Sequence, residues 1–322
     1  MIKLQENKNK PPSVCVVIPT YLREETLLNT VACLLKQDRP ADEILVIDQT
    51  PEYSENVEKQ LQEWHQNRVI RRIKQNVPSV TQARNRGAFE SHCDILIFID
   101  DDVLLNPSFI NKHIVPFSDM KLAGICGQVY ELPIGMYSSE ILYARLQDYE
   151  TDEFRVFRFE NGAEVPTWRG CNCSVRREVF ISVGGSDEAF IGPSWGEEDD
   201  VAFRIRSSGG KIKFYSDVSL IHLKAPIGGC RLRKKSNFQE WKITTSSLIM
   251  LFRHKTLGAQ QDNLPNPNFV AQFFKILRQG PLRRQNIVNP FRMPYALFCF
   301  LIAICYSLFS LVRGPYTKLK WK

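Results

Sequence analysis

The apolar run at residues 95–99 (ILIFI) ends in three consecutive aspartates, Asp100, Asp101 and Asp102. A run this apolar predicts a strand buried on both faces, as in a parallel sheet. The acids would then lie at the carboxyl edge of the sheet, where open α/β folds bind ligands. Adjacent carboxylates repel one another, and a cation such as Mg²⁺ or Mn²⁺ would relieve that repulsion. An acidic turn that caps a helix near Pro107 is the alternative interpretation.

Apolar and amphipathic segments alternate through the first hundred residues. The patterns predict strands over residues 14–18, 43–47 and 69–73, and helices over residues 24–37, 56–67 and 80–91. Strands that alternate with helices favour βαβ crossovers, and so a Rossmann-like, mostly parallel sheet flanked by helices. Thr20 and Asp48 follow the first two strands as Asp100 follows the fourth. We therefore expect three polar side chains at one sheet edge.

The second half of the chain is less regular. The patterns predict strands over residues 124–129, 211–215 and 218–222, and a loop that feeds a strand over residues 168–175. Helices are predicted over residues 137–148, 177–183 and 198–207, two of them closed by glycine pairs. The nine cysteines are dispersed and lack zinc-site spacing, so we expect reduced thiols.

The C-terminal segment differs from the rest of the chain. Residues 281–322 hold seven Lys or Arg and no acid, which accounts for the whole net charge of +7 and does not suggest a nucleic-acid binder. Residues 295–312 carry no charge, and their length is about the minimum for a transmembrane helix. A buried helix and in-plane attachment remain open. The polar N-terminus has no apolar leader, so we expect membrane association with a cytoplasmic catalytic domain.

Seven short segments occur in a characteristic order between residues 14 and about 222. They are residues 17–21 (VIPTY), 46–50 (VIDQT), 83–87 (ARNRG), 98–102 (FIDDD), 184–188 (GGSDE), 196–200 (GEEDD) followed by Arg204, and 219–222 (SLIH). Together they resemble glycosyltransferase family 2, whose members are inverting enzymes with the GT-A fold. Ser186 replaces the usual Phe of the fifth segment.

The resemblance implies a division of the chain. Residues 1–12 would form a polar tail, and residues 13–225 a GT-A domain of the nucleotide-diphospho-sugar transferase type. Residues 226–290 would form a helical extension with a basic loop, and residues 291–322 a membrane anchor with basic flanks.

The resemblance also implies the donor side of the site. Thr20, Asp48 and Arg84 would contact the nucleotide, although Arg84 is also compatible with a structural salt bridge. Asp100 and Asp101 would lie against the donor.

The same resemblance implies a site for a divalent cation, Mn²⁺ or Mg²⁺. Asp102 would bind the metal directly, Asp100 directly or through water, and His222 as a third ligand. The bland interpretation of His222 is a buried core histidine.

The catalytic base would come from the acidic segment. Counting back from Arg204 gives Glu198, whereas the Glu-Asp dipeptide gives Asp199, and both stay open. Part of this acidic run could instead only complement a helix dipole. Trp168, Asn172 and Trp195 are expected on the acceptor side, with core packing equally compatible for the tryptophans.

The implied function is metal-dependent, inverting transfer of a hexosyl or deoxyhexosyl group from a nucleotide-diphosphate sugar. The acceptor would be a saccharide or lipid-linked molecule at a membrane, in surface polysaccharide or glycolipid synthesis. A sugar-nucleotide nucleotidyltransferase is an alternative, but residues 19–25 lack the Gly-rich loop that it needs. A non-catalytic GT-A-fold binding protein and a metal-dependent phosphotransferase are further alternatives. The sequence does not predict the sugar, the linkage or the oligomeric state.

Overall fold

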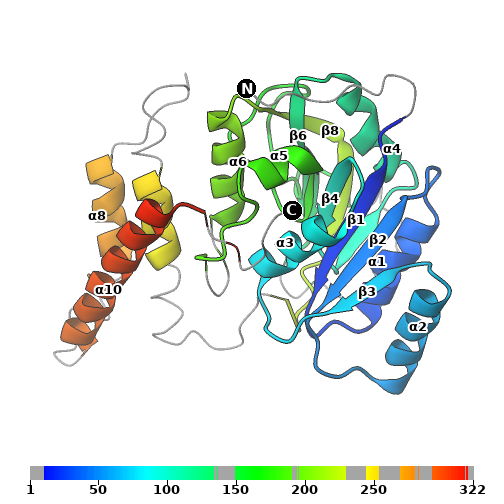
Figure 1. The fold of residues 1–322 in the computed structure, drawn as a ribbon, viewed down its shortest axis with the longest axis horizontal. Coiled ribbons are helices and arrows are strands. Elements are labelled where there is room, and N and C mark those ends of the chain that lie inside the picture. Colours follow the sequence, from blue (N-terminus) through cyan, green and yellow to red (C-terminus); the bar gives the residue numbers. More distant parts are fainter. Residues whose placement is uncertain are drawn as a thin grey trace.

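A mixed β-sheet with helices on both faces forms the body of the protein (Figure 1). The computed structural model describes residues 11–133, 136, 149–190, 194, 196–229, 244–253, 269–279, 282, 292–315 and 317. The sheet has eight strands in the order β3-β2-β1-β4-β7-β6-β8-β5.

The N-terminal half has the predicted βαβ arrangement. Its strands are β1 (Val14–Thr20), β2 (Glu43–Asp48), β3 (Arg71–Lys74) and β4 (Ile95–Ile99), and its helices are α1 (Glu25–Leu35), α2 (Glu55–Gln66) and α3 (Val80–Glu90). Neighbouring strands in this half are parallel, and the register pairs Thr20 with Asp48. The carboxyl ends of β1, β2 and β4 therefore meet at one edge, as predicted.

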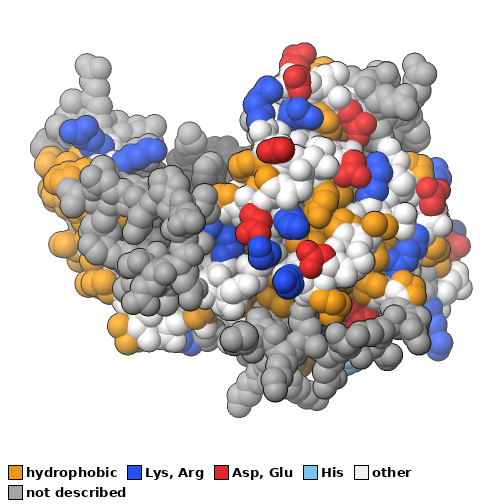
Figure 2. All heavy atoms as spheres, turned by 90° about the horizontal axis from the view of Figure 1, so that it is seen from above, with side chains coloured by type: hydrophobic (Ala, Val, Ile, Leu, Met, Phe, Trp, Pro, Cys, Tyr) orange, Lys and Arg blue, Asp and Glu red, His pale blue; other side chains and the backbone are white. Residues whose placement is uncertain are grey.

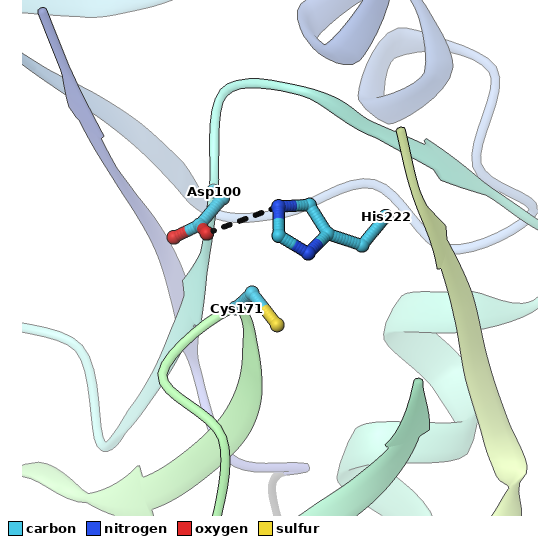
Figure 3. Close-up of side chains that lie close together, drawn as sticks. All are labelled: Asp100, Cys171 and His222. Carbon is cyan, nitrogen blue, oxygen red and sulfur yellow. Dashed lines mark ion pairs between the residues drawn. The ribbon is translucent and has the colours of Figure 1, made fainter. Parts of the chain in front are cut away.

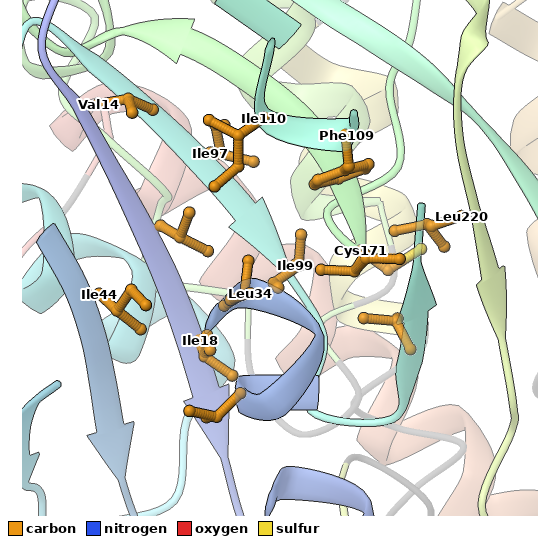
Figure 4. Packing of buried hydrophobic residues seen from close by; sticks show 14 of the residues in the cluster. Val14, Ile18, Leu34, Ile44, Ile97, Ile99, Phe109, Ile110, Cys171 and Leu220 are labelled. Carbon is orange, nitrogen blue, oxygen red and sulfur yellow. The ribbon is translucent and has the colours of Figure 1, made fainter. Parts of the chain in front are cut away.

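Strand β1 shows why this half is buried on both faces. Val14, Val16 and Ile18 join one hydrophobic core with residues of α1 and α2, while Cys15 and Val17 join a second core on the opposite face. Because successive side chains of a strand point to opposite faces, a fully apolar strand needs helices on both sides. Figure 4 shows the first of these cores, with Ile18 and Ile97 of neighbouring strands near Leu34 of α1.

The second half adds antiparallel pairs to the mostly parallel sheet that the sequence predicted. It contains β5 (Val103–Leu105), α4 (Phe109–Ile114), a 3₁₀ helix (Val115–Ser118), β6 (Leu122–Glu131), β7 (Asn172–Arg176), α5 (Arg177–Ser182), α6 (Glu197–Ser207) and β8 (Lys211–His222). Strand β7 is antiparallel to β4 and to β6, and β5 is antiparallel to β8. β7 begins opposite Ile99, where β4 ends, and so it must run back along β4.

Strand β8 is one strand of 12 residues, although two strands were predicted there. It pairs in parallel with β6, and the register shifts between Gly127 and Gln128. This irregularity takes up residues 216–218 without ending the strand. The predicted helix over residues 137–148 lies outside the described residues.

Glycine 87 sets the distance between α3 and the sheet. A Cβ at Gly87 would lie 2.9 Å from Cγ2 of Val17 and closer still to Cγ1. Only a residue without a side chain lets α3 pack this closely on β1. The 83–87 segment is thereby held against the sheet edge where the polar residues gather.

Within the residues that the structure describes, three helices follow the α/β body. Residues 244–253, α8 (Phe269–Gln279) and α10 (Arg292–Arg313) lie together at one side of it, in yellow to red in Figure 1. Within the described residues, Met293–Arg313 is one helix long and apolar enough to cross a membrane, judged by length and composition.

Candidate active site

The aspartate triplet lies where β4 leaves the sheet. After the turn at residues 100–102, β5 pairs with β8 so that Val103 lies opposite His222. This pairing brings His222 to the acids from 120 residues away in the sequence. The side chain of Asp100 is 35% exposed, whereas Asp102 is buried.

Asp100, Asp102 and His222 form a cluster that suits a divalent cation. Nε2 of His222 lies 3.2 Å from Oδ1 of Asp102 and 3.6 Å from Oδ2 of Asp100. Figure 3 shows the Asp100 carboxylate facing the imidazole ring, with the Cys171 side chain beside both. Two carboxylates and one imidazole are a donor set that binds Mn²⁺ or Mg²⁺. Burial raises the pKa of Cys171 well above its usual value, so its thiol stays neutral.

The neighbouring charges in this cluster shift one another's pKa values. Burial disfavours the charged form of His222, but the carboxylates of Asp102 and Glu131 outweigh it and raise its pKa to about 10. Burial raises the pKa of Asp101 to about 7, against the opposing charge of Arg23. A cation at this position would compete with the proton on His222.

Arg23 is a member of this site that the sequence analysis missed. Its guanidinium is buried and contacts Asp101 (Nε–Oδ1, 3.2 Å) and Asp102 (Nη2–Oδ2, 2.9 Å). It also donates to the Ala225 carbonyl at 3.0 Å. Its position three residues after β1, at the same sheet edge as the acids, was the available signal. One oxygen of Asp102 is thereby held by Arg23, and the other faces His222.

Glu131 is a second missed residue. Its Oε1 lies 3.6 Å from Nδ1 of His222, and its Oε2 lies 2.6 Å from the Lys224 ammonium. The contact with the His222 ring is the largest cause that lowers the pKa of Glu131, to about 2. A carboxylate behind a metal-binding histidine fixes the orientation of its ring. Glu131 ends β6, a position that gave no such signal in the sequence.

Asp48 lies at the same edge but is enclosed by protein groups. Arg72 Nε donates to its Oδ2 at 2.7 Å, and Lys74 lies 3.0 Å from the same atom. Its Oδ1 accepts from the Thr50 N–H and the Tyr53 hydroxyl. The nucleotide contacts predicted for Asp48 and for the equally buried Thr20 stay predictions.

A cavity of about 540 Å³ opens beside the triplet. It is lined by Val80, Arg84, Asp100, Phe157, Thr167, Trp168, Arg169, Ser194, Gly196, Glu197, Glu198 and Asp199. Asp100 belongs to the fourth of the predicted segments and Glu198 to the sixth, and both line one cavity. The cavity therefore joins Asp100 of the cluster to the acidic residues at the start of α6.

Glu198 is one of the acidic residues that line this cavity, and two protein groups contact its carboxylate. The N–H of Gly170 donates to its Oε1 at 2.9 Å, and Nη2 of Arg84 lies 3.4 Å from the same oxygen. A Cβ at Gly170 would lie 2.6 Å from this atom, so a larger residue there would displace the Glu198 or Arg84 side chain. Burial raises the pKa of Glu198, with Arg84 opposing the shift. A raised pKa makes a carboxylate a stronger general base.

The other acids of the segment have different surroundings. Glu197 pairs with Arg84 inside the protein, so the described contacts of Arg84 are those of the salt-bridge alternative. Asp199 is exposed and accepts a hydrogen bond from Thr167. Asp200 is buried and pairs with Arg204 at 2.8 Å, which makes it a structural residue.

The acceptor-side predictions need one correction. Asn172 is fully buried, and its amide donates to the carbonyls of Gln128 (2.8 Å) and Val218 (2.9 Å) while its Oδ1 lies 3.0 Å from the His113 ring. It stabilises the junction of three strands and does not face the cavity. Trp168 lines the cavity but is only 3% exposed and packs in the second core. Trp195 lies outside the described residues.

Two family models match this chain. The model of a family described as glycosyl transferase family 2 matches residues 15–183, and one described as the N-terminal domain of galactosyltransferase matches residues 153–225. The chain is 25% identical over 224 residues to a probable N-acetylgalactosaminyltransferase 9 of Caenorhabditis elegans, covering 63% of this chain and 38% of that protein.

Two further relatives show similar partial coverage. A validoxylamine A glucosyltransferase of Streptomyces hygroscopicus subsp. limoneus is 25% identical over 62% of this chain and 49% of its own. A hyaluronan synthase of Streptococcus pyogenes is 29% identical over 54% of this chain and 43% of its own. The chain thus spans about half or less of the length of these relatives.

Solved structures share the fold. A mannosyltransferase from Pyrobaculum calidifontis, in complex with GDP-Man and Mn²⁺, superposes with a TM-score of 0.54 at 12% identity, covering 94% of this chain and 88% of the other. Residues 1–349 of S. aureus TarS give a TM-score of 0.57 at 13% identity, with coverages of 93% and 83%. These neighbours have the GT-A fold predicted here.

Proposed function

Because this chain belongs to glycosyl transferase family 2, we propose that it transfers a sugar from a nucleotide-diphosphate donor to an acceptor hydroxyl with inversion. The observation that carries the proposal is the cavity that Asp100 and Glu198 share. Inverting transfer needs a cation-binding edge for the donor diphosphate and a base across from it, and this cavity offers both.

Glu198 is the proposed general base. It would accept the proton of the acceptor hydroxyl while that oxygen attacks the anomeric carbon and the bond from this carbon to the donor diphosphate breaks. The Gly170 N–H and the Arg84 guanidinium contact one oxygen of the carboxylate. Among the described residues no such pair contacts the second oxygen, and this is the atom we assign to the acceptor.

Asp100, Asp102 and His222 are the proposed ligands of a divalent cation, Mn²⁺ or Mg²⁺. A bound cation would stabilise the charge that develops on the leaving diphosphate. Glu131 would hold the ring of His222, and Arg23 would fix the orientation of Asp102. The neighbouring mannosyltransferase structure was determined with Mn²⁺, which supports this assignment.

The relatives indicate only the broad class of the donor sugar. Their names include mannosyl-, glucosyl- and N-acetylgalactosaminyltransferases, and these support a hexosyl or deoxyhexosyl donor. We place the GT-A domain at residues 13–225 and a membrane-associated extension after it, with the catalytic domain in the cytoplasm. The proposed acceptor is a saccharide or lipid-linked molecule for a surface polysaccharide or glycolipid.

Thermal unfolding with a panel of ligands tests the proposal. Purified protein is heated with nucleoside diphosphates and sugar nucleotides, each with Mn²⁺, Mg²⁺ or EDTA. Ligands that bind the folded state at a hundredfold excess over Kd stabilise it by about 2.7 kcal/mol. We expect a Tm rise of roughly 5–10 °C that requires both a metal and one nucleotide class.

Substitution of a proposed metal ligand makes that test specific. Asp102→Ala should abolish the metal-dependent part of the Tm rise, whereas Asp217→Ala, which removes an exposed acid in the middle of β8, should keep it. The absence of any nucleotide-dependent shift in folded wild-type protein would contradict the proposal. A shift without sugar transfer to any acceptor would favour a binding protein.

A further inference from the structure

Helix α10 has one buried face. Phe300, Ala303, Ser307 and Ser310 are buried, at the spacing of one helical stripe. This stripe packs on the helix at residues 244–253, where Leu248 joins Phe300 and Ala303 in a small core. The Ser307 hydroxyl also contacts the Thr245 carbonyl at 3.2 Å.

The opposite face of α10 is apolar and exposed. Val312 is 89% exposed, Phe309 is 62%, and Phe298 and Leu301 are 61% each. Tyr295, Leu297, Ile302 and Leu308 extend the same face. Figure 2 shows hydrophobic side chains gathered at the side of the molecule where α8 and α10 lie. Monomeric soluble proteins rarely expose an apolar patch this continuous.

The C-terminal half of α10 lies against the catalytic domain. Tyr306 packs on a cluster formed by Ala189, Phe190 and Ile249. Beyond the helix, the Thr317 hydroxyl donates to Oε1 of Glu188 at 2.8 Å. The end of α10 is therefore fixed to the GGSDE segment at residues 184–188.

This packing does not fit a helix that crosses a bilayer. A crossing helix needs about 20 residues within the hydrocarbon, which is nearly all of the 21 residues from Met293 to Arg313. Residues 300–310 pack on a helix whose Arg253 forms buried ion pairs with Asp187 and Asp200 of the catalytic domain. Crossing would draw this polar domain into the hydrocarbon.

We propose that α10 lies in the plane of an anionic membrane surface, with its Phe298–Leu301–Phe309 face inserted among the lipids. Amphipathic helices bind in this way when an apolar face is accompanied by Lys and Arg. The chain supplies that charge, since residues 281–322 hold seven Lys or Arg and no acid. On α8, Lys275 and Arg278 are exposed next to the exposed Phe274.

This positive charge favours anionic lipid over a second copy of the chain as the partner that covers the exposed face of α10. Two identical basic surfaces repel each other, whereas each Lys or Arg near an anionic bilayer contributes about 1 kcal/mol of attraction. The inference concerns attachment and is independent of sugar transfer, so either proposal can fail without the other.

Flotation with lipid vesicles is the first test. Full-length protein should float with vesicles of phosphatidylcholine and phosphatidylglycerol, float poorly with phosphatidylcholine alone, and be released by alkaline carbonate. Combined Phe298→Ser, Leu301→Ser and Phe309→Ser should weaken binding at least tenfold. The matched control, Val77→Ser with Val115→Ser, removes exposed apolar side chains elsewhere and should bind normally.

Insertion depth separates the two orientations. Phe298→Cys and Phe309→Cys are labelled in separate proteins that carry Cys305→Ser, and fluorescence quenching by brominated lipids gives each depth. An in-plane helix places both labels at one shallow depth. A crossing helix separates them by about 16 Å, which would overturn the proposal. Loss of dimerisation in the triple variant, with no vesicle binding by wild type, would overturn it in favour of self-association.

Discussion

The two oxygens of the Glu198 carboxylate are unequal, because Gly170 and Arg84 both contact Oε1. An amide at this position keeps the shape and loses the basicity. We therefore predict that Glu198→Gln lowers kcat by roughly 10²–10⁴-fold, the usual contribution of a general base. The Kd of the donor, measured by calorimetry, should change less than threefold.

Asp199 provides the control for this prediction. It is exposed and bonded to Thr167, so Asp199→Asn should lower kcat by less than tenfold. A dead Asp199→Asn protein together with an active Glu198→Gln protein would move the base by one position.

His113 makes a prediction about stability. It is completely buried between Ser174 and Asn172, and burial lowers its pKa to about 3. The unfolded chain takes up this proton near pH 6.5 and the folded chain does not, so stability falls as pH drops below about 6.5. Between pH 7 and 5.5 this residue should cost roughly 1 kcal/mol of unfolding free energy.

Urea denaturation at several pH values measures this loss. His113→Gln should remove that part of the pH dependence, although its stability at pH 7 falls as well. His92→Gln, which changes an exposed histidine, should leave the dependence as in wild type. An unchanged pH slope in His113→Gln would show that other groups cause the acid sensitivity.

Site residues were predictable where a polar or charged residue lies at the end of a strand. Asp100, Asp102 and His222 come together as expected, because strand ends define the sheet edge. Arg23, Glu131 and the true surroundings of Asn172 were not predictable. Their roles depend on contacts across 44 or more residues, such as that from Arg23 to Asp101, and no local pattern encodes such pairs.

Helix α6 carries the proposed base and is held by a buried ion network. Arg253 contacts Asp187 (2.6 Å) and Asp200, and Arg204 contacts Asp200 at 2.8 Å. Asp200 is two residues from Glu198 on the same helix. The helix at residues 244–253 thus fixes the helix that presents the base.

We predict that Arg253→Lys impairs transfer through position alone. Lysine keeps the charge but cannot contact both carboxylates in the same fork geometry. The kcat should fall about tenfold while the donor Kd stays within twofold, a split that general destabilisation below the Tm would not produce. Arg278→Lys on exposed α8 is the matched control, and an equal fall in both variants would contradict the prediction.

Periodicity predicted the elements best where each strand is uniformly buried. The runs that became β1, β2 and β4 gave a clear signal, as did the amphipathic pattern of α1 and α2. The three residues of β5 were too few to show a pattern, and the direction of β7 leaves no trace in composition. Strand direction depends on which edge the preceding loop reaches.

For the whole molecule, we expect that loss of in-plane attachment slows transfer to acceptors in a membrane and leaves transfer to soluble acceptors unchanged. The triple variant of the α10 face keeps every residue of the cavity. We predict that it transfers sugar to a soluble acceptor at the wild-type rate and to an acceptor in vesicles at least tenfold more slowly. Radiolabelled donor with both acceptors in parallel would measure this, and equal rates on vesicles would contradict it.

The hydrogen bond from Thr317 to Glu188 has a geometric consequence. Glu188 also accepts from Asn85 of α3, so the segment after α10 is joined through Glu188 to the helix whose Arg84 lines the cavity. A body fastened this way cannot tilt freely on the bilayer. The mouth of its cavity would then lie at one fixed height above the lipid. The enzyme would select acceptors by how far they extend from the membrane surface.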